Sequence, residues 1–217
     1  MNTDQDTTTG RPVTTVHTTL DSPLGDLLVI GHVRDDDTLA LASLSMPEQR
    51  GAAHPPHDAR ADAGPFTDLA RRLEAYFAGE PDDFADLTYA THGTPFRERV
   101  WAALDTIPYG TTTTYGAIAA GLGVEPAGVR AVGTAIGRNP LLVLRPCHRV
   151  VGADGALRGY AAGLERKRLL LEREGAWGPA GVSPAFGAVA SRGRDAVAPP
   201  ASPVVTSVAA VPSGRSV

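Results

Sequence analysis

Hydrophobic residues in the first third of the chain alternate with polar residues over short stretches, a pattern typical of β-strands. Two stretches stand out, Leu27–Ile30 and Leu39–Leu44, with the charged turn Arg34–Asp37 between them. Further along, the apolar residues of Phe66–Phe77 recur at helical spacing, and Gly79 follows as a helix terminator. The N-terminal part is therefore predicted to be a small α/β unit.

Helical spacing dominates after residue 93. Thr94 and Pro95 form a typical helix start before the apolar pattern of 96–107. Two shorter helices are expected at 115–121 and 127–136. This order is that of a helix-turn-helix, although similar helix pairs occur in proteins that never touch DNA.

The predicted 127–136 helix, extended by the two residues that follow it, has three polar side chains on one face: Arg130, Thr134 and Arg138. Three glycines lie in this segment or directly at its end, and a glycine costs up to ~1 kcal/mol relative to alanine in a helix: Gly128, Gly133 and Gly137. So much glycine favours close approach of another backbone, either a packed neighbour or a phosphate chain. We interpret this segment as a recognition helix with its arginines directed outward.

Hydrophobic pattern and composition divide the chain into four parts. We expect a disordered N-terminus (1–14), an α/β subdomain (15–92), a mostly α-helical domain (93–177) and a disordered tail (178–217). Three segments inside these parts are also predicted: a mobile surface loop at 47–64, a buried strand at 141–144, and a charged amphipathic helix at 164–174.

Composition is that of a globular protein, with 42% hydrophobic and 20% charged residues among 217. No apolar run approaches the ~20 residues that span a bilayer, and we expect no secretory signal. The single cysteine, Cys147, excludes a disulfide framework and a multi-cysteine metal site within the chain. A lone thiol fits a reducing compartment, so a cytoplasmic location is expected.

Charge is unevenly distributed along the chain. Residues 1–96 contain 16 acidic and 6 basic residues, a net charge of −10, whereas 97–177 contain 7 acidic and 11 basic residues, a net charge of +4. Such asymmetry is expected where the basic half meets a polyanion, but a solvated face also explains an excess of this size. Almost all the basic residues are arginines, which favour phosphate recognition, although high genomic G+C content produces the same bias.

Two interpretations of Cys147 are considered: an inert core residue or a nucleophile. A free cysteine without other context usually behaves as a small buried hydrophobe. Here His148 follows directly, and Arg145 and Arg149 flank the pair. Cationic surroundings lower a thiol pKa, so these neighbours favour a reactive thiolate.

The motifs of the second half carry a family resemblance. Pro146-Cys147-His148-Arg149-Val150 is preceded by Arg130-Ala-Val-Gly133 and Asn139-Pro140, with Phe96–Trp101, Ile107–Gly110 and Tyr115 upstream. In order and spacing this set resembles the O6-alkylguanine-DNA alkyltransferase family, closely over 94–175 and loosely over 14–93. The resemblance implies a ribonuclease H-like α/β N-terminal subdomain and a mostly α C-terminal subdomain (93–177) that binds DNA through a helix-turn-helix and carries the chemistry.

The resemblance also implies a reaction, which is DNA repair by direct reversal. The methyl group of O6-methylguanine, flipped out of duplex DNA, passes once and irreversibly to Cys147 without a cofactor; O4-methylthymine is a further expected substrate. His148 is implied as the base, acting through a water, and Glu174 as the carboxylate that orients it. The expected partner is double-stranded DNA containing O6-alkylguanine, the protein acts as a monomer, and no membrane is involved.

The resemblance assigns the remaining site residues to contacts with DNA and the flipped base. Tyr115 donates to the departing base and crowds the adjacent phosphate, and Arg130 enters the stack that the base has left. Asn139 bridges the recognition helix to the cysteine segment. The carbonyls of Cys147 and Val150 read the guanine amino group, and the pocket lip includes Tyr160 and Ala161. Such a protein enters the minor groove without sequence preference.

Several positions depart from the family pattern. Ala161 and Ala162 stand where a serine and glycine are common, so their methyl groups are expected to narrow the pocket against bulky adducts. Gly116 follows Tyr115 in place of a glutamine or similar residue, and Arg145 replaces an apolar residue. The cysteines that bind zinc in some relatives are absent, so no metal site is predicted.

Two other functions have to be weighed against DNA repair. One is a DNA-binding regulator with Cys147 as a sensor thiol, which predicts base-specific side chains on the 127–138 segment; that segment offers mainly Ala, Gly and Val. The other is a cysteine hydrolase using Cys147 and His148, but no local signature of that class is present.

Overall fold

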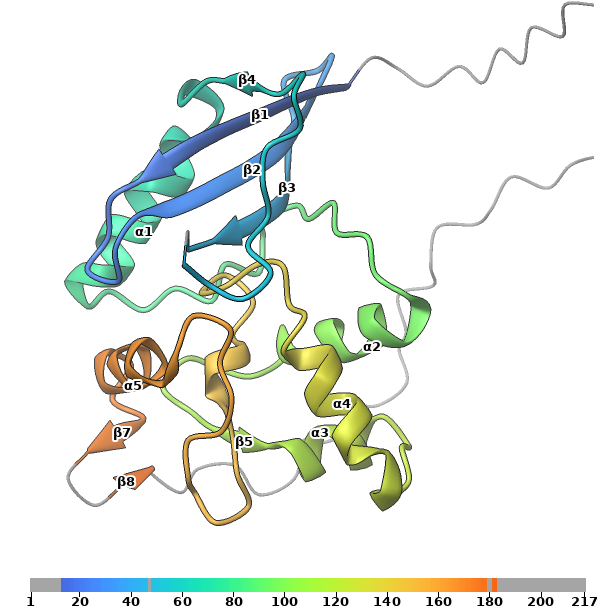
Figure 1. Ribbon diagram of the computed structural model, residues 1–217. Helices are drawn as coiled ribbons and strands as arrows, with labels where there is room; N and C mark the ends of the chain where they lie inside the picture. Colours follow the sequence, from blue (N-terminus) through green and yellow to red (C-terminus); the bar gives the residue numbers. More distant parts are fainter. Residues whose placement is uncertain (1–12, 47, 179–180, 183–217) are drawn as a thin grey trace, which may run out of the picture.

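The computed structural model describes residues 13–46, 48–178 and 181–182 (Figure 1). The strands are β1 (Val13–Leu20), β2 (Leu27–Arg34), β3 (Leu39–Ser45), β4 (Arg60–Ala61), β5 (Thr113–Thr114), β6 (Val150–Val151), β7 (Trp177–Gly178) and β8 (Gly181–Val182). The helices are α1 (Thr67–Ala78), α2 (Pro95–Leu104), α3 (Tyr115–Gly121), α4 (Val129–Ile136) and α5 (Leu164–Arg173). Short 3-10 turns lie at Gly64–Phe66, Pro126–Gly128 and Cys147–Arg149.

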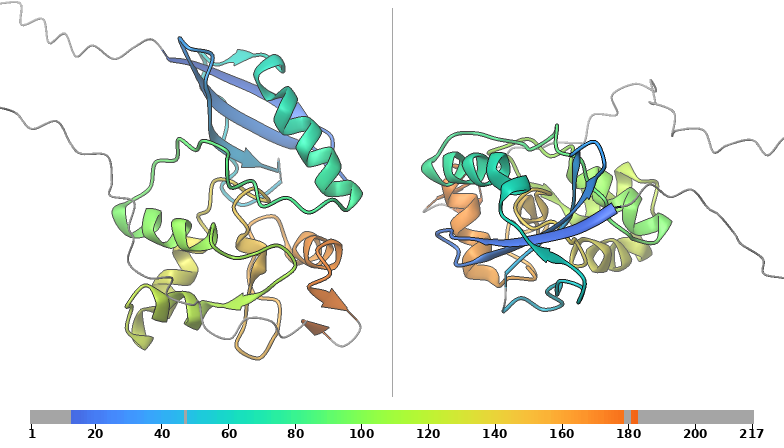
Figure 2. Two further views of the ribbon diagram at one scale, coloured as in Figure 1. Left: turned by 180° about the vertical axis from the view of Figure 1, so that it is seen from behind. Right: turned by 90° about the horizontal axis from the view of Figure 1, so that it is seen from above.

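The N-terminal unit is a four-stranded sheet with α1 against one face, as the view from behind shows (Figure 2). The strand order is β3-β2-β1-β4; β1, β2 and β3 are antiparallel neighbours, and β4 pairs parallel to β1. Helix α1 buries Leu69, Leu73 and Phe77 and ends at Gly79, whose φ of 108° suits glycine. The predicted α/β unit is confirmed.

Two segments of this unit differ from their predictions. Strand β1 begins at Val13, so the last two residues of the predicted disordered segment 1–14 belong to the sheet. The predicted mobile loop 47–64 contains β4, which is held by pairing with Val16 and His17 of β1. The rest of the predicted N-terminal segment, residues 1–12, lies outside the described residues.

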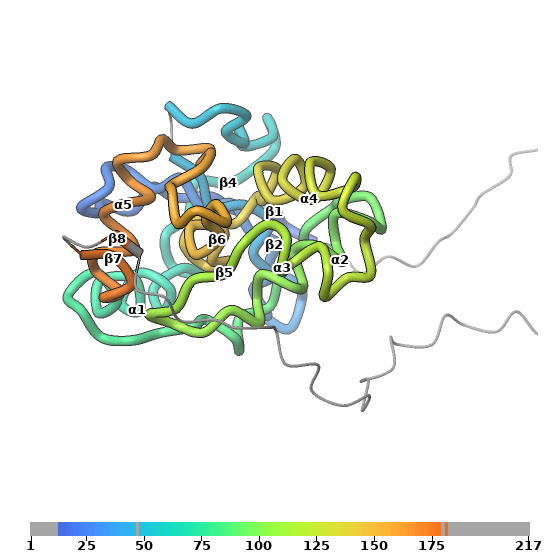
Figure 3. Tube along the Cα trace, turned by 90° about the horizontal axis from the view of Figure 1, so that it is seen from below, coloured from blue at the N-terminus to red at the C-terminus, as the bar shows by residue number. Residues whose placement is uncertain are grey.

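The C-terminal unit is mostly helical, with a short parallel pair of strands, β5 and β6, beside the helices (Figure 3). Thr94 caps α2, because its side chain accepts a hydrogen bond from the backbone of Arg97. Thr114 caps α3 in the same way. Helices α2 and α3 both pack against α4, so α3 and α4 form the predicted helix-turn-helix pair.

Helix α4 is shorter than the predicted 127–136 helix. Residues Pro126–Gly128 form a 3-10 turn before it, and Gly137 is its C-cap. Only Gly133 therefore lies inside the α-helix and carries the cost of glycine there.

The apolar run at 141–144 is not the strand that its composition predicts. It makes tight turns, with only Leu141 bridged to Leu44 of β3. Val143 has a φ of 69°, which is unusual for a β-branched residue, and the backbone N–H of Arg145 donates to the carbonyl of Leu141. All four residues are buried. Burial on every side removes the periodicity that separates a strand from a buried turn, so sequence cannot distinguish them.

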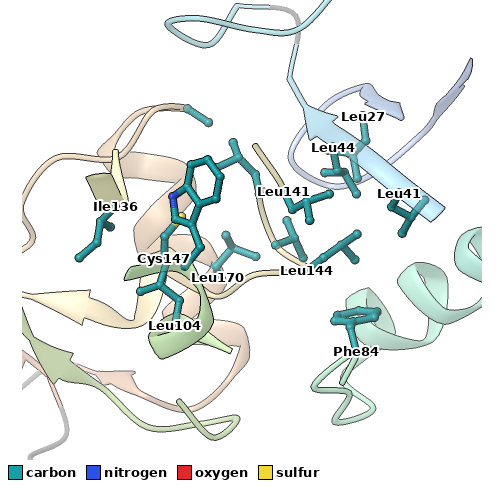
Figure 4. Packing of buried hydrophobic residues seen from close by; sticks show 14 of the residues in the cluster. Leu27, Leu41, Leu44, Phe84, Leu104, Ile136, Leu141, Leu144, Cys147 and Leu170 are labelled. Atoms are coloured by element: carbon teal, nitrogen blue, oxygen red, sulfur yellow. The ribbon is translucent and has the colours of Figure 1, made fainter. Parts of the chain in front are cut away.

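Buried side chains of both units form one hydrophobic cluster (Figure 4). Leu41 and Leu44 of β3 lie beside Leu141 and Leu144, and the same cluster extends to Cys147. The turn that carries the cysteine is therefore anchored by both units.

The end of the described chain also differs from its prediction. Strands β7 and β8 pair as a hairpin, so Gly178, Gly181 and Val182 are paired although they fall in the predicted disordered tail 178–217. The remainder of that tail lies outside the described residues. Among the helices that the structure describes, none combines the length and apolar character needed to cross a membrane.

Candidate functional site

Cys147 opens a 3-10 turn between the buried 141–146 segment and β6. It is only 5% exposed. The side-chain amide of Asn139 donates a hydrogen bond to its sulfur, with 3.1 Å between Nδ2 and Sγ. Cys147 thus differs from an ordinary core cysteine, because its sulfur accepts a polar hydrogen bond inside the core.

Asn139 connects the end of α4 to the cysteine turn, as its implied bridging role requires. Its Nδ2 also donates to the carbonyls of Leu141 and Arg145, at 3.2 and 2.9 Å, and its Oδ1 accepts from the backbone N–H of Leu141. The residue is buried. These bonds hold the 139–147 segment in one conformation and aim the thiol.

The flanking arginines do not lower the pKa of Cys147 enough to make it a thiolate, which is what their position in the sequence favours. Burial raises the pKa of Cys147, and the hydrogen bond from Asn139 and the charges of Lys167 and Arg145 offset only part of that effect. Arg145 and Arg149 are each paired with a carboxylate, Asp105 at 2.9 Å and Glu174 at 2.8 Å. The resting thiol is therefore protonated at neutral pH.

His148 lies next to Glu174, with 2.9 Å between Nε2 and Oε1, and both side chains are fully buried. Burial lowers the pKa of His148, so the imidazole is neutral at pH 7. Because a carboxylate only accepts hydrogen bonds, Nε2 carries the ring proton and Nδ1 presents a lone pair. Among the described residues Nδ1 has no hydrogen-bond partner. The imidazole therefore has a basic nitrogen free to accept a proton.

Glu174, at the C-cap of α5, accepts four hydrogen bonds: from Tyr76 Oη at 2.7 Å, His148 Nε2 at 2.9 Å, Arg149 Nε at 2.8 Å and Arg149 Nη2 at 2.9 Å. Burial opposes its charge, but its interactions with His148 and Arg149 outweigh burial and hold the pKa of Glu174 well below its usual range. The carboxylate is therefore ionised and fixed in orientation.

Two of these partners are absent from the predicted site. Arg149 was visible in the sequence only as a flanking charge; its guanidinium also donates to the carbonyl of Ile107 at 2.6 Å. Tyr76 belongs to α1 of the N-terminal unit, 98 residues from Glu174. No local pattern could link residues so far apart.

Lys167 is a third residue that the sequence did not place in the site. Its buried Nζ donates to the carbonyls of Val150 and Arg158, at 2.6 and 2.7 Å. Burial lowers the pKa of Lys167 to about 8. The carbonyl of Val150, implied to read the guanine amino group, thus already accepts one hydrogen bond. Helical spacing could have predicted that Lys167 is buried, because it shares the inward face of α5 with Leu170 and Leu171.

A groove of about 1180 Å³ brings together four predicted site residues: Tyr115, Arg130, Tyr160 and Ala161. Arg130 is exposed on α4, and the hydroxyl of Tyr115 donates weakly to the carbonyl of Arg158, at 3.4 Å. The N-terminal unit reaches the groove too, since the backbone N–H of Arg50 donates to the carbonyl of Ala161 at 3.3 Å.

Cys147 does not line this groove but lies close to it. Burial raises the pKa of both Tyr115 and Tyr160, and the neighbouring Cys147 adds to each shift. The structure places the predicted residues in two sets: those at the groove, and the buried cluster of Cys147, His148, Glu174, Asn139 and Val150. Within the described ranges, no group of three or more His, Cys, Asp or Glu side chains is arranged to hold a metal ion.

Two family models match the chain, one for each unit. Residues 95–176 match the 6-O-methylguanine DNA methyltransferase, DNA binding domain, and residues 15–90 match the 6-O-methylguanine DNA methyltransferase, ribonuclease-like domain. These matches confirm the expected fold class of a ribonuclease-like N-terminal unit and a helical C-terminal unit.

Full-length relatives agree with both models. The methylated-DNA–protein-cysteine methyltransferase of Mycobacterium tuberculosis is 46% identical over 162 residues, which are 75% of this chain and 93% of that protein. Its namesake from Methanosarcina barkeri is 43% identical over 155 residues, 71% of this chain and 94% of that protein. The crystal structure of M. tuberculosis OGT in complex with DNA superposes with a TM-score of 0.65 at 46% identity, covering 74% of this chain and 92% of that one. The chain therefore belongs to the O6-methylguanine DNA methyltransferase family, the methylated-DNA–protein-cysteine methyltransferases.

Proposed function

We propose that this protein repairs duplex DNA by transferring the methyl group of O6-methylguanine to Cys147 in a single irreversible turnover. The observation that carries the proposal is the buried set of a thiol, a neutral histidine with a free Nδ1, and an ionised glutamate on the opposite ring nitrogen. This is the order of nucleophile, base and orienting group that an activated thiol needs.

Proton transfer is the step that the buried set must provide. The thiol is protonated at rest, so His148 Nδ1 takes the proton of Cys147 through a bridging water while Glu174 stabilises the imidazolium. The S–C bond forms as the C–O6 bond breaks, and the displaced guanine anion, still part of the DNA, takes up a proton on N1. This proton balances the one that the thiol gave to His148. No electron acceptor or second substrate is required, and the thioether persists.

The groove provides for the DNA and the flipped base. Arg130 lies exposed on α4 and fills the gap left by the base, and Tyr115 donates to the departing base. Asn139 aims the thiol, the carbonyls of Cys147 and Val150 accept from the guanine amino group, and Tyr160 and Ala161 form the lip. The relative solved in complex with DNA supports a DNA partner for this chain.

Pocket width sets the range of adducts. Ala161 and the buried Ala162 are both among the residues that line the groove, and we infer that their methyl groups reduce the room beside the flipped base. We therefore propose methyl adducts, on O6 of guanine and on O4 of thymine, as the preferred substrates. The protein acts on them as a monomer, and a cytoplasmic location stays a prediction.

Burial of the thiol also separates this function from its rivals. A redox-sensing thiol is typically exposed and acidic, whereas Cys147 is 5% exposed and its pKa is raised. A cysteine hydrolase holds its thiol in a direct hydrogen bond with the base, whereas here the sulfur bonds to Asn139.

The deciding experiment is incubation of the protein with duplex DNA that contains O6-methylguanine, followed by intact-mass measurement and peptide mapping. One methyl group per molecule should appear on Cys147 without any added cofactor. Unmodified protein after prolonged incubation, or several turnovers per molecule, would show the proposal to be wrong. Cys147→Ser is the matched control that should bind DNA and gain no methyl group.

A further inference from the structure

A second hollow, of about 440 Å³, lies between the two units and adjoins the groove. Its walls come from strands β1 to β3, the segment after β3, the start of α2 and residues 137–140. The groove and this inter-domain cavity share four residues at their boundary: Arg50, Gly137, Arg138 and Ala161. The two hollows therefore form one continuous surface that runs past the C-terminal end of α4.

The charge of the cavity is strongly one-sided. Three arginines and three histidines line it: Arg50, Arg97, Arg138, His32, His54 and His92. Its lining contains no Asp or Glu, although residues 1–96 hold 16 acidic side chains and supply most of the lining. The acidic N-terminal unit thus presents a non-acidic face to this hollow, which is the arrangement expected for an anionic ligand.

Four of the six arginines that line the two hollows lack partners among the described residues. Of the other two, Arg158 pairs with Asp154, and Arg166 donates to the carbonyls of Leu24 and Ala162. Among the described residues, no ion pair and no hydrogen bond is made by the guanidinium groups of Arg50, Arg97, Arg130 and Arg138. Most other arginines with described partners are held in ion pairs: Arg60, Arg71, Arg72, Arg145, Arg149, Arg158 and Arg168. Guanidinium groups that are left uncompensated and gathered on one surface are available to phosphates.

We propose that the phosphodiester backbone of bound DNA continues from α4 into the inter-domain cavity, where Arg50, Arg97 and Arg138 bind its phosphates. The proposal rests on the proposed function, and it makes the N-terminal unit part of the DNA-binding surface through Arg50. Such contacts carry no sequence information, so they suit a protein that must search DNA of any sequence.

The test measures the affinity of the full-length protein for undamaged duplex DNA over a range of salt concentrations. Each phosphate contact contributes about one unit to the slope of log K against log salt. Arg97→Gln and Arg138→Gln should each reduce the slope by about 1, and the double variant by about 2. Arg34→Gln is the matched control, because Arg34 is exposed, unpaired among described residues and outside both hollows.

A series of duplexes with one flank shortened stepwise locates the contacts. The affinity of the parent for DNA should fall when the flank that reaches the cavity is removed. The affinity of the double variant should not change on that removal. Equal slopes for the parent and both cavity variants would overturn the proposal, as would an equal loss in Arg34→Gln. A change confined to cooperative binding on long DNA would instead indicate an acidic protein segment in the cavity and would also overturn it.

Reaction with free O6-methylguanine base, measured on the same variants, separates this proposal from the proposed function. A lower rate of Cys147 methylation by DNA, together with an unchanged rate of methylation by the free base, would support the phosphate contacts. Equal loss on both substrates would contradict them. Failure of the parent itself to become methylated would count against the proposed function alone, because the salt slopes are measured on undamaged DNA.

Discussion

The hydroxyl of Tyr76 donates a hydrogen bond of 2.7 Å to Glu174, joining α1 of the N-terminal unit to the end of α5. Both residues are buried, and the same carboxylate oxygen accepts from His148 and Arg149. The orientation of the proposed base therefore depends on a residue outside the unit that carries the thiol. This contact gives the ribonuclease-like unit a direct physical connection to the chemistry.

Replacing Tyr76 by Phe should weaken both stability and reaction. A hydrogen bond to a charged group contributes about 1.5–3 kcal/mol, so we expect the free energy of unfolding to fall by about that amount. The rate of Cys147 methylation should also fall and its pH profile should shift, because Glu174 orients His148 less firmly. Urea unfolding and single-turnover kinetics measure the two effects.

Tyr109→Phe is the control for that variant. Its hydroxyl makes only a long hydrogen bond, 3.4 Å, to the carbonyl of Arg173. A stability change as large as that of Tyr76→Phe would show that the bond to Glu174 has no special weight.

Glu174→Gln should be severely destabilising and should alter acid stability. It leaves Arg149 buried without a counter-charge, which costs about 3–5 kcal/mol. The pKa of Glu174 is lowered in the folded state, so its stabilisation is complete above the unfolded pKa of about 4.3 and is lost as pH falls toward the folded value. Below about pH 4.3 the parent should lose stability as Glu174 takes up a proton, and the variant should not show this contribution. Unfolding measured at several pH values checks the difference.

Glu172→Gln is the matched control on the same helix. Glu172 pairs with Arg168 at the surface, and exposed pairs contribute about 0–1 kcal/mol. If this variant and Glu174→Gln lost the same stability, the importance of the buried network would be refuted.

Arg130→Ala should separate base flipping from chemistry. The side chain is exposed on α4, away from the thiol, so reaction with free O6-methylguanine should persist while the rate on duplex DNA drops about 10-fold or more. Parallel single-turnover measurements on both substrates check this. Equal losses on the two substrates would rule out a role in filling the DNA stack.

The pair of Arg145 and Asp105 should respond unequally to removal of its members. The Arg145 side chain is 6% exposed and that of Asp105 is 35% exposed. Asp105→Ala leaves a buried guanidinium unpaired and should cost about 3–5 kcal/mol, whereas Arg145→Leu leaves a carboxylate that water can reach. Burial raises the pKa of Asp105 above its usual range, although the hydrogen bond and charge of Arg145 offset part of that effect, so this carboxyl takes up a proton more readily than an exposed aspartate does.

A double-mutant cycle on the two positions measures their coupling. The doubly apolar variant should recover most of the stability that Asp105→Ala loses, since no charge is left uncompensated. Additive losses would show that the two side chains do not act as a pair.

Much of the helical framework could be predicted from local signals. Helix starts are marked by Thr94 and Thr114, whose side chains accept hydrogen bonds from free backbone N–H groups, and by Pro95, which has no N–H. Gly79 ends α1 because it adopts a positive φ. These effects depend on residues within one helical turn. The turns at 141–144 escaped prediction for the opposite reason, because their conformation depends on packing between the two units.

The sequence by itself determined the family and the position of the thiol, because these depend on an ordered set of residues along the chain. It named His148 and Glu174 as partners of the thiol only through the family resemblance. Only the tertiary structure decided which of these residues are buried, which are ion-paired and how their pKa values shift. It buried Cys147 and raised its pKa, neutralised Arg145 and Arg149 in ion pairs, and brought Tyr76 to Glu174. The physical reason is that burial and electrostatic pairing depend on neighbours in space, and these neighbours are as much as 98 residues apart in the chain.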